Sequence, residues 1–157
     1  MIWRWMARRQ ERRRQAARHR EVVASLDVLS RALLQGQVDS SEATIRMSVL
    51  LDCLPQDVQP KVDVAAIHRL AEDVGGFDRG ETRRQLSARE RNRQDLDRLR
   101  LEDEQSEAVL AATRRLQDVI NQWQARFSRS RLKPRSGRDA APMTLQTRPW
   151  SRERRGH

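Results

Sequence analysis

The sequence has one cysteine, no tyrosine and two phenylalanines among its 157 residues. A single cysteine excludes an intramolecular disulfide, which is consistent with a reducing compartment. No run of about 18 apolar residues occurs, so no segment of this sequence is expected to cross a bilayer as a helix. The N-terminal charges are not followed by the apolar stretch of a secretory signal peptide, so none is expected.

Patterns typical of catalysis or metal binding are also scarce. His19, His68 and His157 are scattered, and none lies one helical turn from a second histidine or a cysteine, so no zinc site is expected. The acidic residues at 102–107 lack the Glu-x-x-His pairs of a di-metal bundle and are interpreted as a solvated helix face. Cys53 has no neighbouring His or Lys to activate its thiol and is interpreted as a small core residue. We therefore expect no catalytic residue, no metal, no cofactor and no small-molecule substrate.

Charge is abundant and unevenly distributed. Charged residues make up 34% of the chain, and its formal net charge is +10. Residues 1–20 carry eight arginines and one glutamate, and residues 128–157 carry nine basic and two acidic residues, whereas residues 21–127 carry a net charge of −4. Basic ends of this kind bind phosphate, in anionic lipid headgroups or in nucleic acid. The pattern predicts a basic N-terminal arm over residues 1–20, a helical domain over residues 21–127 and a disordered basic tail over residues 128–157.

Apolar residues recur with the period of a helix, no segment alternates as a strand does, and the predicted fold class is all-α. Val22, Leu26, Leu29 and Leu33 follow a 4-3-4 spacing, which predicts a first helix. Nothing upstream breaks a helix, so it can begin as early as residue 3, with the arm and the first core helix forming one rod. Gly36 is suited to end it.

Residues 39–54 are the most apolar and best delimited segment, and the remaining chain is expected to pack around it. Asp39 and Glu42 are three residues apart and match a capping box, and Pro55 stops the helix. Because the link from Gly36 is short, the first two helices are predicted to form an antiparallel hairpin.

A third and shorter helix is predicted over residues 64–74, with Asp63 as its cap and Gly75-Gly76 at its end. The polar segment that follows is expected to be a connection in which Phe77 anchors onto the core.

A long charged helix is predicted from Ser87, which matches a capping box with Glu90, to about Phe127. Its apolar stripe contains Leu96, Leu99, Val109, Leu110, Leu116, Val119, Ile120, Trp123 and Phe127. Polar residues interrupt this stripe at 102–107, so the helix is expected to bend or to leave the core there.

The predicted core draws on the first three helices. Its members are Leu26, Leu29, Leu33, Ile45, Met47, Val49, Leu50, Leu54, Ile67 and Leu70. In a core position, truncation of Leu50 to alanine would destabilise the protein by about 2–5 kcal/mol.

The first residues combine aromatic and basic side chains. Tryptophans beside an arginine cluster are typical of the cytoplasmic end of a membrane segment, and a frayed basic helix start is the alternative. The residues expected to contact a membrane surface are Trp3, Trp5, Arg8, Arg9, Arg12, Arg13 and Arg14.

Two short blocks, LLQGQ at residues 33–37 and IRMSVLLD at residues 45–52, precede a charged helix after residue 87. Over about residues 20–125 the chain resembles the bacterial domain-of-unknown-function family 2489. The resemblance implies a small helical protein on the cytoplasmic face of the inner membrane, and no established activity. Members usually have an N-terminal membrane helix, which is missing here, so attachment is expected to be peripheral, or anchored if an upstream helix was lost by start-site assignment. The basic tail is a second departure.

The preferred interpretation is a non-enzymatic adaptor or interaction module with an anionic membrane surface and an unidentified protein as partners. A nucleic-acid-associated basic protein, cytoplasmic rather than membrane-bound, is the alternative. Its charge fits, but the sequence has no zinc knuckle, RNA-recognition signature or convincing helix-turn-helix. An enzyme ranks last.

Overall fold

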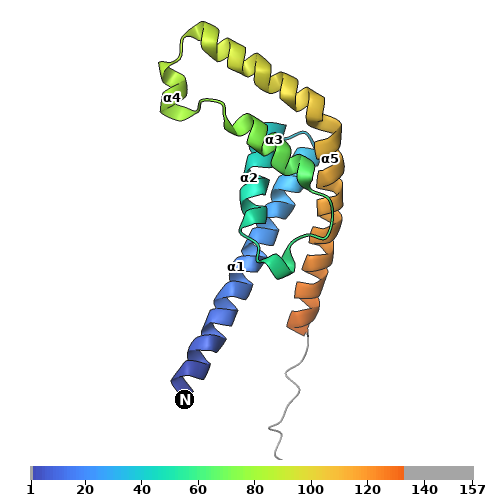
Figure 1. The fold of residues 1–157 in the computed structure, drawn as a ribbon. Coiled ribbons are helices and arrows are strands. Elements are labelled where there is room, and N and C mark those ends of the chain that lie inside the picture. The colour runs from blue at the N-terminus through green and yellow to red at the C-terminus, as the bar shows by residue number, and fades with distance from the viewer. Residues whose placement is uncertain (1, 133–157) are drawn as a thin grey trace, which may run out of the picture.

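The computed structural model describes residues 2–132, and within this range all regular structure is helical, apart from turns (Figure 1). The elements are α1 (Ile2–Leu34), α2 (Ser40–Asp52), a 3-10 turn (Gln56–Val58), α3 (Ala65–Gly75), α4 (Gly80–Gln85) and α5 (Ala88–Leu132). The predicted all-α fold class is confirmed. α5 continues past the predicted end of the domain at residue 127, and the rest of the predicted disordered tail, residues 133–157, lies outside the described residues.

The first helix is a single rod that begins at Ile2, as the absence of any breaker before Gly36 predicts. Gly36 has a φ of +68°, which costs glycine little because it has no Cβ. Its N–H donates to the carbonyl of Leu33 at 3.0 Å, and the N–H of Gln37 donates to the carbonyl of Ala32 at 2.8 Å. This pair of bonds is a Schellman motif, which satisfies helix carbonyls and turns the chain back toward α2.

Asp39 is the N-cap residue of α2, but its side chain makes no capping hydrogen bond, so the predicted capping box with Glu42 is wrong. Glu42 pairs with Arg46 one turn later instead. The other end of α2 is closed by a residue that the sequence pattern does not single out. The amide nitrogen of Gln59 donates to the carbonyls of Leu51 and Leu54 at 2.9 and 2.7 Å.

The core lies between α1, α2, α3 and the second half of α5 (Figure 1). Its buried apolar residues are Val23, Leu26, Leu33, Ala43, Met47, Leu51, Leu54, Ile67, Leu70, Val74, Val109, Ala112, Leu116 and Ile120. Six residues of the predicted core are therefore buried: Leu26, Leu33, Met47, Leu54, Ile67 and Leu70. Leu29, Ile45 and Leu50 are partly buried and pack against this core.

Val49 was placed in the core by the sequence pattern, and that prediction is wrong, because the residue is 59% exposed. The buried face of α2 passes through Met47 and Leu51, and Leu51 is 1% exposed. Val49 is two residues from each, which is about 200° around a helix and therefore on the opposite side. Cys53 is also exposed rather than part of the core, because it is the C-cap residue of α2.

The third helix matches its prediction to within a residue at each end. The carboxylate of Asp63 accepts a hydrogen bond from the N–H of Ala65 at 2.9 Å, which satisfies a free donor in the first turn. Phe77 packs against the core as expected. The polar connection that follows contains the short helix α4, which the sequence pattern does not indicate.

The capping box at the start of α5 is confirmed. The Glu90 carboxylate accepts from the N–H of Ser87 at 2.8 Å, and the hydroxyl of Ser87 accepts from the N–H of Glu90 at 3.3 Å. The hydrogen bonds from the hydroxyl and the N–H of Ser87 lower the pKa of Glu90.

α5 changes direction within the stretch that turns from yellow to orange in Figure 1, as the interruption at residues 102–107 predicts. Its first half leaves the core, so Leu96 and Leu99, the first part of the apolar stripe, are exposed. Its second half, from Val109 onward, packs along α1.

Candidate membrane-contact surface

The first half of α1 extends beyond the core as an isolated helix, seen as the blue rod in Figure 1. Every side chain from residue 3 to residue 18 is exposed. We refer to residues 3–18 as the arm. Trp3 and Trp5 at its tip are 84% and 61% exposed. All seven predicted membrane-contact residues lie on the arm: Trp3, Trp5, Arg8, Arg9, Arg12, Arg13 and Arg14.

Positive charge surrounds the arm on all sides. Arg12, Arg13 and Arg14 are consecutive, so their side chains point about 100° apart around the helix axis. Among the ion pairs of the described residues, none includes an arginine of residues 4–20. The guanidinium of Arg9 lies over the ring of Trp5, 5.2 Å from its centroid. The arm therefore has no apolar face of its own, and its available chemistry is attraction of anions plus an aromatic tip.

The arm meets the core at His19, which lies edge-on to two aromatic rings of α5. The ring centroid of His19 is 6.0 Å from that of Trp123 and 5.3 Å from that of Phe127. Burial lowers the pKa of His19, and the negative charge of Asp57 opposes this shift only in part. The neutral form of the His19 ring is therefore favoured where it contacts the two aromatic rings.

Two turns into the core, Asp27 joins α1 to α5. Its carboxylate accepts from the amide nitrogen of Gln117 at 2.6 Å and from Nε of Arg31 at 2.9 Å. Burial by itself would raise the pKa of Asp27. Hydrogen bonds from Gln117, Arg31 and Gln124, together with the positive charge of Arg31, outweigh this effect, so the net shift of the pKa is downward. The bond to Gln117 and the His19 contacts thus join α1 to α5 at the place where the arm leaves the core. Sequence reasoning missed Asp27 and Gln117, because a polar contact between residues so far apart leaves no local pattern.

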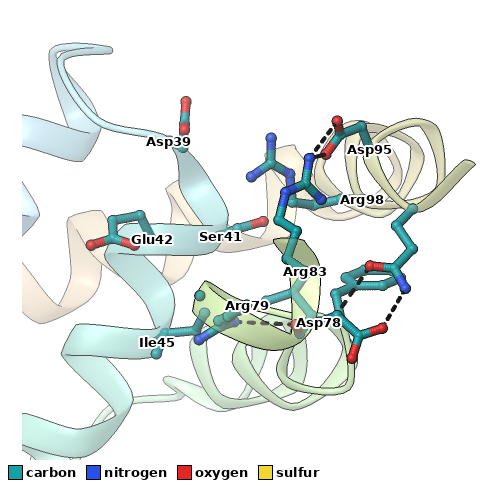
Figure 2. A pocket seen from close by; sticks show the side chains of 13 residues that line it. Asp39, Ser41, Glu42, Ile45, Asp78, Arg79, Arg83, Asp95 and Arg98 are labelled. Carbon is teal, nitrogen blue, oxygen red and sulfur yellow. Dashed lines mark hydrogen bonds and ion pairs between the residues drawn. The ribbon is translucent and has the colours of Figure 1, made fainter. Parts of the chain in front are cut away.

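A polar pocket of about 530 Å³ lies between the start of α2, the α3–α4 segment and the first half of α5. Figure 2 shows Arg83 of α4 directed at Asp95 of α5, with nitrogen-to-oxygen distances of 2.8 and 3.0 Å. Gln94 bonds to Asp78 at 2.8 Å beside them. These polar contacts, rather than burial of Leu96 or Leu99, attach the first half of α5. The carboxylates on the α4–α5 side of the pocket are engaged, so we interpret it as structural.

One serine and one histidine meet in the α2–α3 contact, where Ser48 Oγ and Nδ1 of His68 are 2.8 Å apart. Within the described range no carboxylate bonds to the other ring nitrogen, so the pair lacks the orienting acid of a hydrolytic triad. We interpret it as a contact that joins two helices.

No helix between residues 2 and 132 combines the length and the apolar character required to cross a bilayer. In the same part of the chain, no three or more His, Cys, Asp and Glu side chains are arranged to hold a metal ion.

No curated protein and no solved structure matches the chain. A family model, described as protein of unknown function DUF2489, matches residues 2–116, so the match extends through the arm, which the resemblance from residue 20 onward leaves out. Because this match covers more than half of the 157 residues, the chain belongs to the DUF2489 family of proteins of unknown function.

Proposed function

We propose that this protein is a non-enzymatic interaction module that attaches to the cytoplasmic face of a bacterial inner membrane through its arm. The observation that carries the proposal is the arm itself, a helix exposed on every side with seven arginines and one acidic residue between positions 3 and 18. Such a density of one charge is unfavourable without an anionic surface nearby.

The electrostatic contribution can be scaled from the number of charges. A basic residue close to an anionic leaflet contributes about 1 kcal/mol. Removing five such charges would therefore weaken attachment by about three to four orders of magnitude at low salt. The attraction is screened over about 10 Å at 0.1 M salt, so attachment should weaken steeply as salt is added.

The tip of the arm favours a membrane over other anionic partners. Trp3 and Trp5 are exposed at the end of the helix, where indole rings can enter the headgroup region. An amphipathic helix would bury one apolar face in the interface, and the arm has none. The expected attachment is therefore electrostatic along the arm, with aromatic insertion confined to its tip.

Vesicle flotation of the full chain tests the proposal. The protein should float with vesicles of phosphatidylcholine and phosphatidylglycerol and stay behind with phosphatidylcholine alone. Replacing Arg8, Arg9, Arg12, Arg13 and Arg14 with glutamine should release it into the unbound fraction.

The matched control removes the same number of charges from elsewhere on the protein. Arg69, Arg89, Arg93, Arg114 and Arg126 are all exposed and lie outside the arm, so their replacement with glutamine should leave flotation close to wild type. Equal loss in both variants would show a dependence on net charge alone and contradict a role for the arm. Salt-sensitive gel shifts with nucleic acid, combined with indifference to anionic vesicles, would replace this proposal with the nucleic-acid alternative.

A further inference from the structure

A pocket of about 450 Å³, separate from the polar pocket in Figure 2, lies at the base of the arm. We call it the base pocket. Its lining comes from His19 of α1, from the loop at residues 57–62 and from one face of α5. In Figure 1 this loop lies between α1 and the second half of α5. The volume is within the range of about 300–1,000 Å³ that is usual for small-molecule sites.

One wall of the base pocket is apolar. Val119, Trp123 and Phe127 recur every four residues along α5, so they share one face of the helix. Val58 and Val62 of the loop belong to the same lining. Trp123 and Phe127 are only partly buried, so their rings remain accessible to a ligand. This wall therefore suits the apolar body of a small molecule.

The polar part of the lining contains two cations. Lys61 of the loop and Arg126 of α5 are both exposed, and they come from different parts of the chain. Among the ion pairs between described residues, none includes either side chain. Asp57 is the one acidic residue of the lining, so positive charge exceeds negative charge in the pocket. The lining thus combines an apolar wall with an attraction for anions.

The charge around the base pocket favours a dianion over a monoanion. Arg18 and Arg20 flank His19 in α1, and Arg129 follows Arg126 by three residues in α5. These side chains add to the positive potential at the pocket. A phosphate monoester carries about 1.5 to 2 negative charges at pH 7, whereas a carboxylate carries one. Its terminal oxygens can also accept from an ammonium and a guanidinium group at the same time.

We propose that the base pocket binds a small organic phosphate, with its apolar body against Trp123 and its phosphate group between Lys61 and Arg126. Such a ligand would use both parts of the lining, the apolar wall and the two cations. It would join the loop to α5 beside the point where the arm leaves the core. This binding site goes beyond the proposed membrane contact, which requires no small molecule.

Fluorescence of Trp123 without any lipid present tests the proposal. Replacing Trp3, Trp5 and Trp150 with phenylalanine leaves Trp123 as the only tryptophan. Phenyl phosphate should change its emission with a dissociation constant of about 1 mM or below. Phenol lacks the phosphate group and inorganic phosphate lacks the apolar body, so each should bind at least about tenfold more weakly. Water-soluble dibutyryl phosphatidylglycerol, a diester with a single charge, should compete with phenyl phosphate about tenfold less well than phenyl phosphate itself.

Charge variants of this single-tryptophan protein test the roles of the lining residues. Lys61→Gln combined with Arg126→Gln should weaken binding of phenyl phosphate at least about tenfold. Asp57→Asn should strengthen it about two- to fivefold, because a like charge is removed. The matched control is Arg69→Gln combined with Arg114→Gln, which removes the same net charge from exposed positions on α3 and α5 outside the pocket. This control should bind as the unaltered lining does, and circular dichroism should show unchanged helicity in every variant, because all five residues are exposed.

Four results would each overturn the proposal. Equal binding of phenol and phenyl phosphate would show that the phosphate group is not recognised. Equal loss of binding in the two double variants would show that only net charge matters. Competition by the soluble lipid at the same concentrations as phenyl phosphate would assign the pocket to a lipid headgroup. An unchanged emission of Trp123, together with no binding by ligand-observed NMR, would show that the pocket takes no organic phosphate. None of these measurements involves vesicles, so their outcome is separate from that of the flotation test.

Discussion

Truncation of two adjacent leucines in α2 provides a sharp test of the packing. Leu51 is 1% exposed and lies among residues of the main core, whereas Leu50 is partly buried and lines an open apolar groove between α1 and α2. Leu51→Ala leaves a cavity between packed helices and should cost about 2–5 kcal/mol. Leu50→Ala removes a side chain that already contacts solvent, so it should cost less than about half of the stability that Leu51→Ala costs.

The two substitutions have identical chemistry and helix propensity, so their difference measures burial alone. A loss of about 3 kcal/mol is a large part of the 5–15 kcal/mol by which domains are usually stable. It should lower the melting temperature by about 10 °C for a chain of this size. Urea denaturation followed by circular dichroism gives both free energies of unfolding, provided that the slopes of the transitions agree.

The refuting result is a reversed order. If Leu50→Ala costs more than Leu51→Ala, the buried face of α2 is the one that apolar spacing in the sequence predicts, and the helix is rotated from the position described above.

Four further perturbations have defined outcomes. Gly36→Ala should destabilise the protein by about 1 kcal/mol in the same denaturation assay, because a Cβ is strained at a φ of +68°. The lowered pKa of His19 means that the folded state disfavours the protonated ring, so stability should fall as the pH drops below about 6.5, and His19→Phe should remove that part of the pH dependence. The lowered pKa of Asp27 means that the folded state favours the ionised carboxylate, so its contribution to stability is complete above about pH 4 and is lost as the pH falls below that value. Asp27→Asn should therefore be less stable than wild type at pH 7, with the difference shrinking in acid. Replacing Trp3 and Trp5 with alanine should weaken flotation with anionic vesicles less than the five-arginine replacement does. Brominated lipid should quench tryptophan fluorescence in the wild-type protein and should no longer do so in this variant.

The extents of the helices were largely readable from local chemistry. Nothing between Ile2 and Gly36 interrupts a helix, and Gly36 supplies the left-handed conformation that ends it. Ser87 and Glu90 form the reciprocal bonds that their spacing predicts. Such signals act within a few residues, so no knowledge of the tertiary contacts is needed to interpret them. The exposed arm follows equally directly, because a helix charged on every side has no face to bury.

The orientation of α2 was decided by its neighbours. This helix has apolar residues in nearly every direction, including Ile45, Met47, Val49, Leu50 and Leu51, so its own pattern allows more than one buried face. Contacts with α1, α3 and α5 select the face of Met47 and Leu51. The rejected face, with Val49 at its centre, remains exposed and lines an apolar groove between α1 and α2.

The same dependence explains the first half of α5 and the junction of the arm. Leu96 and Leu99 have helical spacing, but no other helix lies near enough to cover them, and polar contacts hold this half of α5 instead. The bond from Gln117 to Asp27 joins residues ninety positions apart, and only the packing of α1 on α5 brings them together. Sequence by itself determined where helices begin and end, because those signals are local; the tertiary structure decided which sides they bury, because that depends on surfaces contributed by distant parts of the chain.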